Sequence, residues 1–418
     1  MNSIRVVLSV CAAYAYEMEQ LDADTSFLNS ELEDRVYMEL NKAIYGLKQA
    51  ASAWNKTINR VFLDCGFKSC GADQCVYFKR SKNNFIYVCL YVDDMIIAAK
   101  TSDEISDVKD ALKSVFKMKE LGPAKFILGM EIDHNMTAGT LMIKQTRYID
   151  DVANRFGQEN ARTVDNPCAT GLKLSKSQSP ASDAERSKMQ SRPYRFLIGC
   201  LLYITTCTRP DIAFVVTQLS RFLDNPEQQY WSAAIRVLRF LKTTHQHVII
   251  YKGGTGSVTA EAYSDADWGS NPDDRRSVSG VMIMIGNAPV VFKSKFKRTV
   301  ALSSAEAEYM ALSLCVQEVL WTRAILTDMG MVQMKATQIW EGNQGAIALA
   351  QNAGYHARTK HVNIRHHFIR ETIEDGTVAV AYVDTKHQLA DILTKALGSK
   401  TFKFLRDANS IQCKETKQ

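Results

Sequence analysis

Several common signals are missing from this chain of 418 residues. Its ten cysteines form no Cys-x-x-Cys pair, and Cys65, Cys70 and Cys75 are too widely spaced for a zinc knuckle, which favours reduced thiols in an intracellular protein. No apolar run approaches the length of a membrane span, and residues 1–5 lack the pattern of a signal peptide. Internal repeats and heptad arrays are also missing. We therefore expect an intracellular globular protein without a membrane partner.

The composition is that of a chain able to bury substantial hydrophobic cores. Hydrophobic residues make up 46% and charged residues 23% of the sequence, and the length allows two or three domains. The formal net charge of +6 is compatible with a nucleic-acid partner but does not require one.

Changes in composition divide the chain. A polar, serine-rich stretch at 169–193 predicts a flexible loop, and the glycine-rich run Gly253–Ser257 predicts a linker. Between them, Asp224 or Asn225 would cap a long helix that has Pro226 in its first turn and an apolar stripe at helical spacing after it. The predicted units are 1–122, 123–252 and 258–405, with a tail at 406–418.

An acidic pair, Asp93 and Asp94, interrupts a long apolar segment. The β-branched and aromatic runs Phe85–Val92 and Met95–Ala99 flank it, which predicts a β-hairpin with the aspartates at the turn. Two like charges at a tight turn repel each other, and a divalent cation such as Mg²⁺ would relieve that repulsion. Such cations can hold the attacking and leaving oxygens of a phosphoryl transfer. The alternative interpretation is an acidic surface hairpin.

Tyr91-Val92-Asp93-Asp94 resembles the signature of reverse transcriptases, and further motifs in order along the chain resemble the Pol polyprotein of copia-type retrotransposons. These further motifs are Leu21–Asn29, Val36–Glu39, Tyr45–Ala50, Thr208–Ala213, Tyr263–Trp268, Ala301–Tyr309, Thr359–His361 and Gln388–Lys395. One four-residue match would be weak evidence, whereas this ordered series covers nearly the whole chain.

The resemblance implies an α+β fold: a reverse-transcriptase palm with a helical thumb or connection, followed by an α/β ribonuclease-H-like domain. It places the third metal-binding carboxylate of the polymerase at Asp22, beside Asp93 and Asp94. Asp24 is the near alternative, and the spacing to the following Phe-Leu-Asn favours Asp22. Mg²⁺ is the expected cofactor, with Mn²⁺ as its substitute.

The resemblance also implies three nucleotide-binding residues. Phe27 falls where these polymerases place a bulky side chain beneath the sugar, and a ring there would clash with a ribose 2′-hydroxyl. Plain core packing is an equally good interpretation of Phe27. Tyr45 and Gly46 resemble the loop that contacts the incoming nucleotide and template. Most of the family's fingers region is absent upstream of Asp22, so we expect an incomplete binding cleft.

A second set of carboxylates is predicted in the ribonuclease-H-like unit. The resemblance assigns metal binding to Asp265, Glu308 and Asp391, and Glu308 shares a predicted helical face with apolar residues, where an unpaired glutamate is costly. The family's remaining aspartate is replaced by Gly342. Glu341 precedes it, but adjacent strand residues point to opposite faces, so we expect weak or absent ribonuclease H activity.

A basic segment lies between these carboxylates in the sequence. Lys293, Lys295 and Lys297 would share one strand face beside Arg298, which suits contact with a phosphate backbone. A solvated strand edge protected by lysines is an equally good interpretation.

The resemblance therefore implies an RNA-directed DNA polymerase with ribonuclease H activity, impaired by the missing fingers region and by Gly342. Its partners would be an RNA template, a DNA primer and product, an RNA–DNA hybrid, deoxynucleoside triphosphates and other parts of the same polyprotein. Its location would be the cytoplasm, a virus-like particle or the nucleus. The alternative is a decayed, inactive fragment that binds nucleic acid or has a structural role only.

Overall fold

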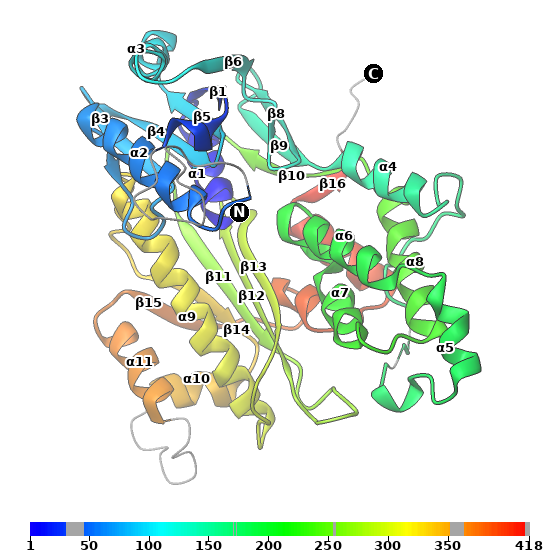
Figure 1. The fold of residues 1–418 in the computed structure, drawn as a ribbon. Coiled ribbons are helices and arrows are strands. Elements are labelled where there is room, and N and C mark those ends of the chain that lie inside the picture. Colours follow the sequence, from blue (N-terminus) through cyan, green and yellow to red (C-terminus); the bar gives the residue numbers. More distant parts are fainter. Residues whose placement is uncertain (31–45, 170, 173, 254–255, 352–362, 414–418) are drawn as a thin grey trace.

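A computed structural model describes residues 1–30, 46–169, 171–172, 174–253, 256–351 and 363–413. The described strands are β1 (Glu17–Ala23), β2 (Lys68–Ser69), β3 (Val76–Ser81), β4 (Asn84–Tyr91), β5 (Asp94–Ala99), β6 (Met118–Pro123), β7 (Phe126–Ile127), β8 (Met130–Asn135), β9 (Thr140–Lys144), β10 (His247–Lys252), β11 (Ala260–Ala266), β12 (Val278–Ile285), β13 (Ala288–Phe296), β14 (Thr337–Glu341), β15 (Val378–Tyr382) and β16 (Ile411–Cys413). The described α-helices are α1 (Asn2–Ala13), α2 (Ala50–Asp64), α3 (Ser102–Lys113), α4 (Thr146–Arg155), α5 (Asp183–Gln190), α6 (Tyr194–Cys207), α7 (Ala213–Leu219), α8 (Gln228–Thr243), α9 (Ser304–Asp328), α10 (Gln344–Gln351), α11 (Asn363–Glu374) and α12 (Ser399–Ala408). Figure 1 shows this mixed α+β arrangement, in which the described strands form three sheets.

The first sheet has the strand order β2-β3-β4-β5-β1-β6, and its neighbouring strands are antiparallel. Helices α2 and α3 cover one face, where Trp54 and Ile58 share a core with Leu112. The other face packs Tyr87 and Ile96 into the core that contains α1. Because both faces are covered, β4 and β5 are apolar along nearly their whole length rather than at alternate positions.

The turn between β4 and β5 lies one residue earlier than the sequence predicts. Tyr91 and Asp94 are paired across the hairpin, so the turn consists of Val92 and Asp93. Val92 has a φ of 54°, a left-handed conformation that is uncommon for a β-branched residue. The buried indole of Trp54 donates to the carbonyl oxygen of Val92 at 2.7 Å. This contact from α2 holds the turn, and Asp94 becomes the first residue of β5.

The second sheet has the order β16-β10-β9-β8-β7 and lies beside the helices α4 to α8 (Figure 1). Helix α8 begins at Gln228, with the Glu227 side chain as its cap, two residues after the predicted Pro226. The segment 169–193, predicted as a loop, contains α5 and a short 3₁₀ helix at Lys176–Gln178 that the sequence prediction did not include. Among the described residues, none of the helices combines the length and apolar character needed to cross a bilayer.

The third sheet has the order β13-β12-β11-β14-β15. Strands β11, β12 and β13 are antiparallel neighbours, whereas β14 runs parallel to both β11 and β15. Helix α9 packs against β11 and β12, and α10 and α11 pack against α9. This sheet positions the carboxylates described below.

Helix α1 joins parts of the chain that are far apart in sequence. Buried Arg5 donates from Nε to the carbonyl of Val290 at 2.9 Å, and from Nη1 to the carbonyls of Thr206 at 2.6 Å and Cys207 at 2.9 Å. Its guanidinium also lies 4.2 Å from the ring centroid of Phe292. One cation near the N-terminus thus satisfies backbone groups of α6 and β13 together.

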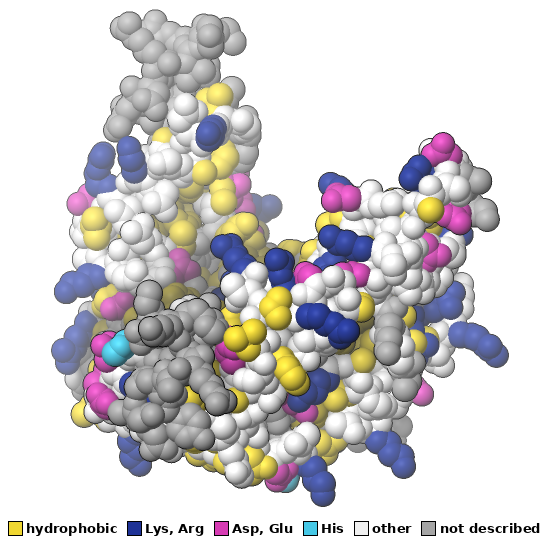
Figure 2. Space-filling view, turned by 90° about the horizontal axis from the view of Figure 1, so that it is seen from below, with side chains coloured by type: hydrophobic (Ala, Val, Ile, Leu, Met, Phe, Trp, Pro, Cys, Tyr) yellow, Lys and Arg dark blue, Asp and Glu magenta, His cyan; other side chains and the backbone are white. Residues whose placement is uncertain are grey.

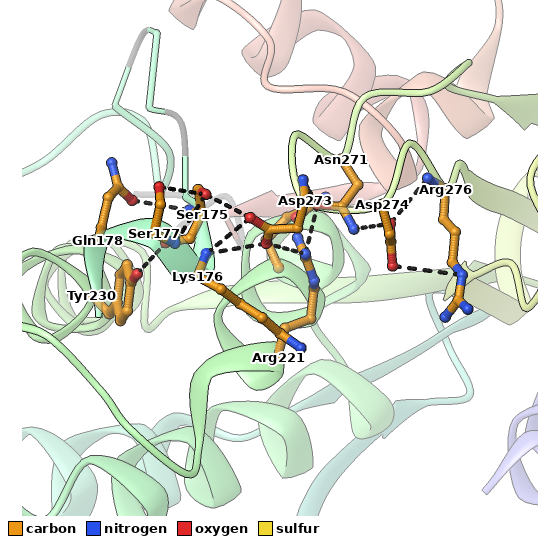
Figure 3. Close-up of polar contacts among 11 residues, drawn as sticks. Ser175, Lys176, Ser177, Gln178, Arg221, Tyr230, Asn271, Asp273, Asp274 and Arg276 are labelled. Atoms are coloured by element: carbon orange, nitrogen blue, oxygen red, sulfur yellow. Dashed lines mark hydrogen bonds and ion pairs between the residues drawn. The ribbon is translucent and has the colours of Figure 1, made fainter. Parts of the chain in front are cut away.

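A second polar junction ties the 175–178 segment to the loop between β11 and β12 (Figure 3). The carboxylate of Asp273 accepts hydrogen bonds from Ser175 Oγ at 2.5 Å and from the backbone N–H of Lys176 at 3.0 Å. Arg221 Nη2 lies 3.0 Å from Asp273 and 2.6 Å from the side-chain oxygen of Asn271. These contacts fix the loop next to one of the candidate sites.

Replacing Asp211 with asparagine is expected to lower the free energy of unfolding by about 3–5 kcal/mol, because it leaves a buried guanidinium without its counter-charge. Both side chains of the Arg209–Asp211 pair are buried, and two parallel hydrogen bonds of 2.9 and 2.8 Å join them. Urea unfolding would measure the change. The matched control is Asp224→Asn, which breaks the exposed Arg195–Asp224 pair and should leave the free energy of unfolding nearly unchanged. Equal losses in the two variants would contradict the prediction.

Candidate functional site

The first acidic cluster consists of Asp22, Asp93 and Asp94. Asp22 on β1 and Asp94 on β5 are directly opposite each other in the antiparallel ladder, so their side chains leave the same face of the sheet. The backbone N–H of Ala23 donates to the carbonyl of Asp93 at 2.9 Å, which draws the turn against β1. The fold therefore brings the three predicted carboxylates together, although Asp22 is far from the other two in sequence.

The surroundings of this cluster raise the pKa of one member. Burial is the main reason that the pKa of Asp22 lies above its usual value, and the charges of Asp94 and Asp93 add to the shift. By contrast, Lys117 forms an ion pair of 2.7 Å with Asp24 and lowers the pKa of that carboxyl. Asp24 already has its own cation, which leaves Asp22 as the better metal ligand of the two.

The candidate nucleotide-binding residues are only partly described. Phe27 lies in a 3₁₀ turn, Ser26–Asn29, that follows Asp22 and is half-buried against the core of the first sheet. The hydroxyl of Ser26 donates to the Asp93 carboxylate. Gly46 has a φ of 92°, which favours glycine at that position. Tyr45 lies outside the described residues.

The second acidic cluster consists of Asp265, Glu308, Glu341 and Asp391. Asp265 lies on β11, Glu308 on α9 and Asp391 in a 3₁₀ turn, Leu389–Leu393, that packs against β11 and β12. The side chains of Asp265 and Asp391 are each only 4% exposed. The hydroxyl of Thr394 donates to one oxygen of Asp265.

Glu341 is more closely associated with this cluster than the sequence suggested. It ends β14 beside Ser264 of β11 and is fully buried. One of its oxygens accepts the backbone N–H of Asn343 at 3.0 Å. The other oxygen, like Oε2 of Glu308, is buried and has no hydrogen-bond partner among the described residues. Strand alternation predicted that Glu341 and residue 342 point to opposite faces, but it could not show that Glu308 on α9 lies near enough to Glu341 and Asp265 for their charges to raise its pKa.

Burial and like charges raise the pKa of three carboxyl groups in the second cluster, those of Glu308, Glu341 and Asp391. Burial raises the pKa of Glu308, and the charges of Glu341 and Asp265 raise it further. Burial also raises the pKa of Glu341, although the hydrogen bond from Asn343 opposes the shift. For Asp391, burial and then the charge of Asp265 raise the pKa. A cation entering the cluster would reverse these shifts.

The donor set of both clusters suits a hard divalent cation, because carboxylate oxygens are the preferred protein ligands of Mg²⁺. The two buried, unpartnered oxygens of Glu308 and Glu341 are groups that a cation would satisfy. Within the part of the chain that the structure describes, no group of three or more His, Cys, Asp or Glu side chains is already arranged as metal ligands. Metal binding would therefore require side-chain adjustment in either cluster.

Replacing Glu341 with glutamine is expected to make stability less dependent on pH. An unfolded glutamate ionises near a pKa of about 4.3, whereas the fold raises the pKa of Glu341 and Glu308. The folded chain then binds more protons than the unfolded chain, so the free energy of unfolding falls as the pH rises above that usual value through neutrality. Thermal unfolding would be measured in EDTA at about pH 5 and about pH 8. The loss of stability between these two pH values should be smaller for the variant than for wild type. The exposed Glu371→Gln should behave like wild type, and an unchanged loss in Glu341→Gln would contradict the prediction.

The structure does not present the predicted basic stripe as one exposed face. Lys297 is buried and its ammonium donates to the carbonyl of Ala307 in α9. Lys293 is half-buried and pairs with Glu318. Lys295 and Arg298 are exposed. The correction arises because α9 supplies partners for two of the lysines, the Ala307 carbonyl for Lys297 and the Glu318 carboxylate for Lys293, which a pattern of alternating residues does not show.

The sequence is similar to known retrotransposon proteins. A family model described as reverse transcriptase (RNA-dependent DNA polymerase) matches residues 1–170. The retrovirus-related Pol polyprotein from transposon TNT 1-94 of Nicotiana tabacum is 39% identical over 97% of this chain and 32% of its own length. The putative transposon Ty5-1 protein of Saccharomyces cerevisiae is 31% identical over 72% of this chain and 100% of its own length. The chain belongs to the copia-type retrotransposon Pol polyproteins and contains their reverse transcriptase domain.

This copia-type chain spans about a third of the length of the Pol relative from Nicotiana tabacum, since it covers 32% of that protein. The Pol polyprotein from transposon RE2 of Arabidopsis thaliana is 34% identical over 96% of this chain and 28% of its own length. A solved foamy viral protease-reverse transcriptase in complex with an RNA/DNA hybrid covers 90% of this chain and 45% of its own, with a TM-score of 0.48 and 9% identity. The relatives from Nicotiana tabacum and Saccharomyces cerevisiae confirm the family predicted from the motifs, and the observed helices and sheets confirm the mixed α+β class.

Proposed function

We propose that this copia-type chain is an RNA-directed DNA polymerase that carries a weak ribonuclease H activity. The observation that supports the polymerase most strongly is the pairing of Asp22 with Asp94 beside the Asp93 turn. Three carboxylates from two distant segments then lie at one end of a sheet within a chain that contains a reverse transcriptase domain.

The proposed domains follow the three sheets. The first sheet with α2 and α3 would be the palm, and residues 123–252 would be the thumb and connection. Residues 258–405 would be the ribonuclease-H-like domain, whose sheet has three antiparallel strands extended by two parallel ones. Figure 2 shows Lys and Arg side chains, with Asp and Glu side chains among them, near the hollow in the surface. A net charge of +6 and such a surface suit an RNA template, a DNA primer and their hybrid.

In the polymerase site, Asp22, Asp93 and Asp94 would hold Mg²⁺, or Mn²⁺ in its place. The bound metal pair would supply the charge that stabilises the attacking and leaving oxygens of nucleotide addition. The chain's own residues prepare this site: the Ser26 hydroxyl orients Asp93, and Trp54 fixes the turn. Phe27, on the turn after Asp22, would exclude a ribose 2′-hydroxyl by steric contact.

In the ribonuclease H site, Asp265, Glu308 and Asp391 would hold the metal. Glu341 pairs with Ser264 in the parallel register of β14 and β11. The next residues along the two strands are Gly342 and Asp265, so a carboxylate at residue 342 would have faced Asp265. Glycine supplies no ligand there, and we therefore propose weak cleavage. The same observation favours a second candidate function, a fragment that binds hybrids without cleaving them.

Three assays on this chain test the proposal. Primer extension on an RNA template with deoxynucleotides should require Mg²⁺ and stop in EDTA, and RNA cleavage in a labelled hybrid should be slow. Hybrid binding measured at several salt concentrations should weaken as salt rises, because phosphate contacts release counterions. Salt-dependent binding without extension or cleavage would favour the binding fragment. Absence of binding and of both activities would contradict both functions.

A further inference from the structure

A lysine bridges two members of the second acidic cluster. Nζ of Lys395 lies 3.0 Å from Oδ1 of Asp265 and 2.6 Å from Oδ1 of Asp391. The two aspartate side chains are each 4% exposed, whereas the lysine side chain is 37% exposed. The ammonium therefore bridges two buried carboxylates while its stem remains accessible.

The local backbone fixes this arrangement. Lys395 follows Asp391 by four residues, and its backbone N–H donates to the Asp391 carbonyl at 3.1 Å. The neighbouring Thr394 hydroxyl donates to the second oxygen of Asp265. Both carboxylate oxygens of Asp265 are thus engaged by side chains of consecutive residues. A cation coordinated through Oδ1 of Asp265 and Oδ1 of Asp391 would have to take the place of the ammonium, because both would use the same two oxygens.

We propose that Lys395 is an internal counter-ion that competes with the divalent cation for Asp265 and Asp391. This inference rests on the proposed ribonuclease H site. Charge-assisted hydrogen bonds to two buried carboxylates are strong, so their rupture would weaken the apparent affinity for metal. Lys395 would then raise the concentration of divalent cation at which the site fills. This effect would add to the loss of affinity caused by the missing carboxylate at Gly342.

The surroundings give the displaced side chain somewhere to go. A cavity of about 410 Å³ lies between α7 and the loop after β11, and Lys395 forms part of its lining. Thr394, Asp267 and Arg275 line it as well. A half-exposed lysine stem can rotate into this space without unpacking the 3₁₀ turn that carries Asp391.

Metal binding by Lys395→Met tests the proposal without using activity. Mn²⁺ titrations followed by electron paramagnetic resonance should give an affinity about tenfold tighter than that of the parent chain. Both proteins would carry Asp93→Asn, so that the first cluster contributes little. The exposed Lys400→Met is the matched control and should leave the affinity unchanged. Adding Asp265→Asn to Lys395→Met should remove the gain in Mn²⁺ affinity, and this result would show that the gain arises in the second acidic cluster.

A second measurement needs no substitution at Lys395. Acetylation of Lys395 by an amine-reactive ester, followed by mass spectrometry, should increase severalfold when Mg²⁺ is added, because displacement frees the amine from its two carboxylates. Labelling of Lys400 should not change. An unchanged or weaker Mn²⁺ affinity in Lys395→Met, or labelling that Mg²⁺ does not alter, would overturn the proposal. Cleavage of the RNA–DNA hybrid is measured separately. If the chain cleaves the hybrid but Lys395→Met binds Mn²⁺ no more tightly, only the counter-ion role of Lys395 is rejected. If Lys395→Met binds Mn²⁺ more tightly but no cleavage is seen, only the proposed ribonuclease H activity is rejected.

Discussion

Primer extension is expected to fall roughly a thousandfold or more when Asp93 is replaced by asparagine, because the site loses one of the carboxylates that hold the catalytic metals. Asparagine keeps the size of the side chain and can still bond to the Ser26 hydroxyl. The backbone contact between the carbonyl of residue 93 and Ala23 is also unaffected. The loss should therefore appear in the rate of nucleotide addition, measured with a labelled primer on an RNA template, and not in thermal stability.

Asp24→Asn is the matched control for this substitution. Asp24 lies two residues from Asp22, but its carboxylate pairs with Lys117 at 2.7 Å and is not part of the first acidic cluster. This variant should extend the primer at nearly the parent rate. Similar losses in both variants would indicate a general electrostatic effect, and full activity in Asp93→Asn would remove the main support for a polymerase site.

Gly342→Asp is expected to increase hybrid-dependent RNA cleavage in Mg²⁺ by about tenfold or more, because it restores a carboxylate facing Asp265. The site has room for the side chain: the nearest atoms to a Cβ at residue 342 are Nε2 of Gln388 at 3.8 Å and the carbonyl of Val383 at 3.9 Å. The backbone of Gly342 is outside the left-handed region, so a non-glycine residue should be tolerated.

Gly342→Asn separates the charge from the shape of the new side chain. It should fold as well as Gly342→Asp and should leave cleavage at the parent rate. Cleavage would be followed with a labelled RNA strand annealed to DNA, with single-stranded RNA as the substrate control. Equal and robust cleavage by all three proteins would mean that Glu341 or another group already fills the role of the missing carboxylate.

The sequence predicted the hairpin at Asp93 but placed its turn one residue too late. Apolar runs on both sides indicated two strands, and this inference depends only on local pattern. The exact turn depends on Val92 in a left-handed conformation, which its own side chain disfavours and which a hydrogen bond from Trp54 stabilises. Tertiary contacts of this kind have no local signal, and the same applies to the start of α8 at Gln228.

The candidate sites show the same division between motif and environment. The motifs led to Asp265, Glu308 and Asp391, and the structure places all three in one cluster with buried or half-buried side chains. Nothing in the sequence indicated that Lys395 bridges two of them, because a lysine in a charged C-terminal segment is usually solvated. The buried position of Glu341 was missed for a related reason: the residue that approaches it belongs to a different element, α9.

The position of α1 affects how the chain can be made. The hydrogen bond from Arg5 to the carbonyl of Val290 can form only after Val290 has been synthesised. Ribosomes add roughly 5–20 residues per second, so the two residues are separated by on the order of 15–60 s of translation. During that interval the part of α1 that packs against β13 has no final partner, and it is accessible to chaperones or to other nascent chains. A gene fragment that stops at residue 170 would retain the sheet that carries Asp93 and leave that surface uncovered. Expression of the isolated reverse transcriptase segment should therefore yield aggregated protein more readily than expression of the whole chain.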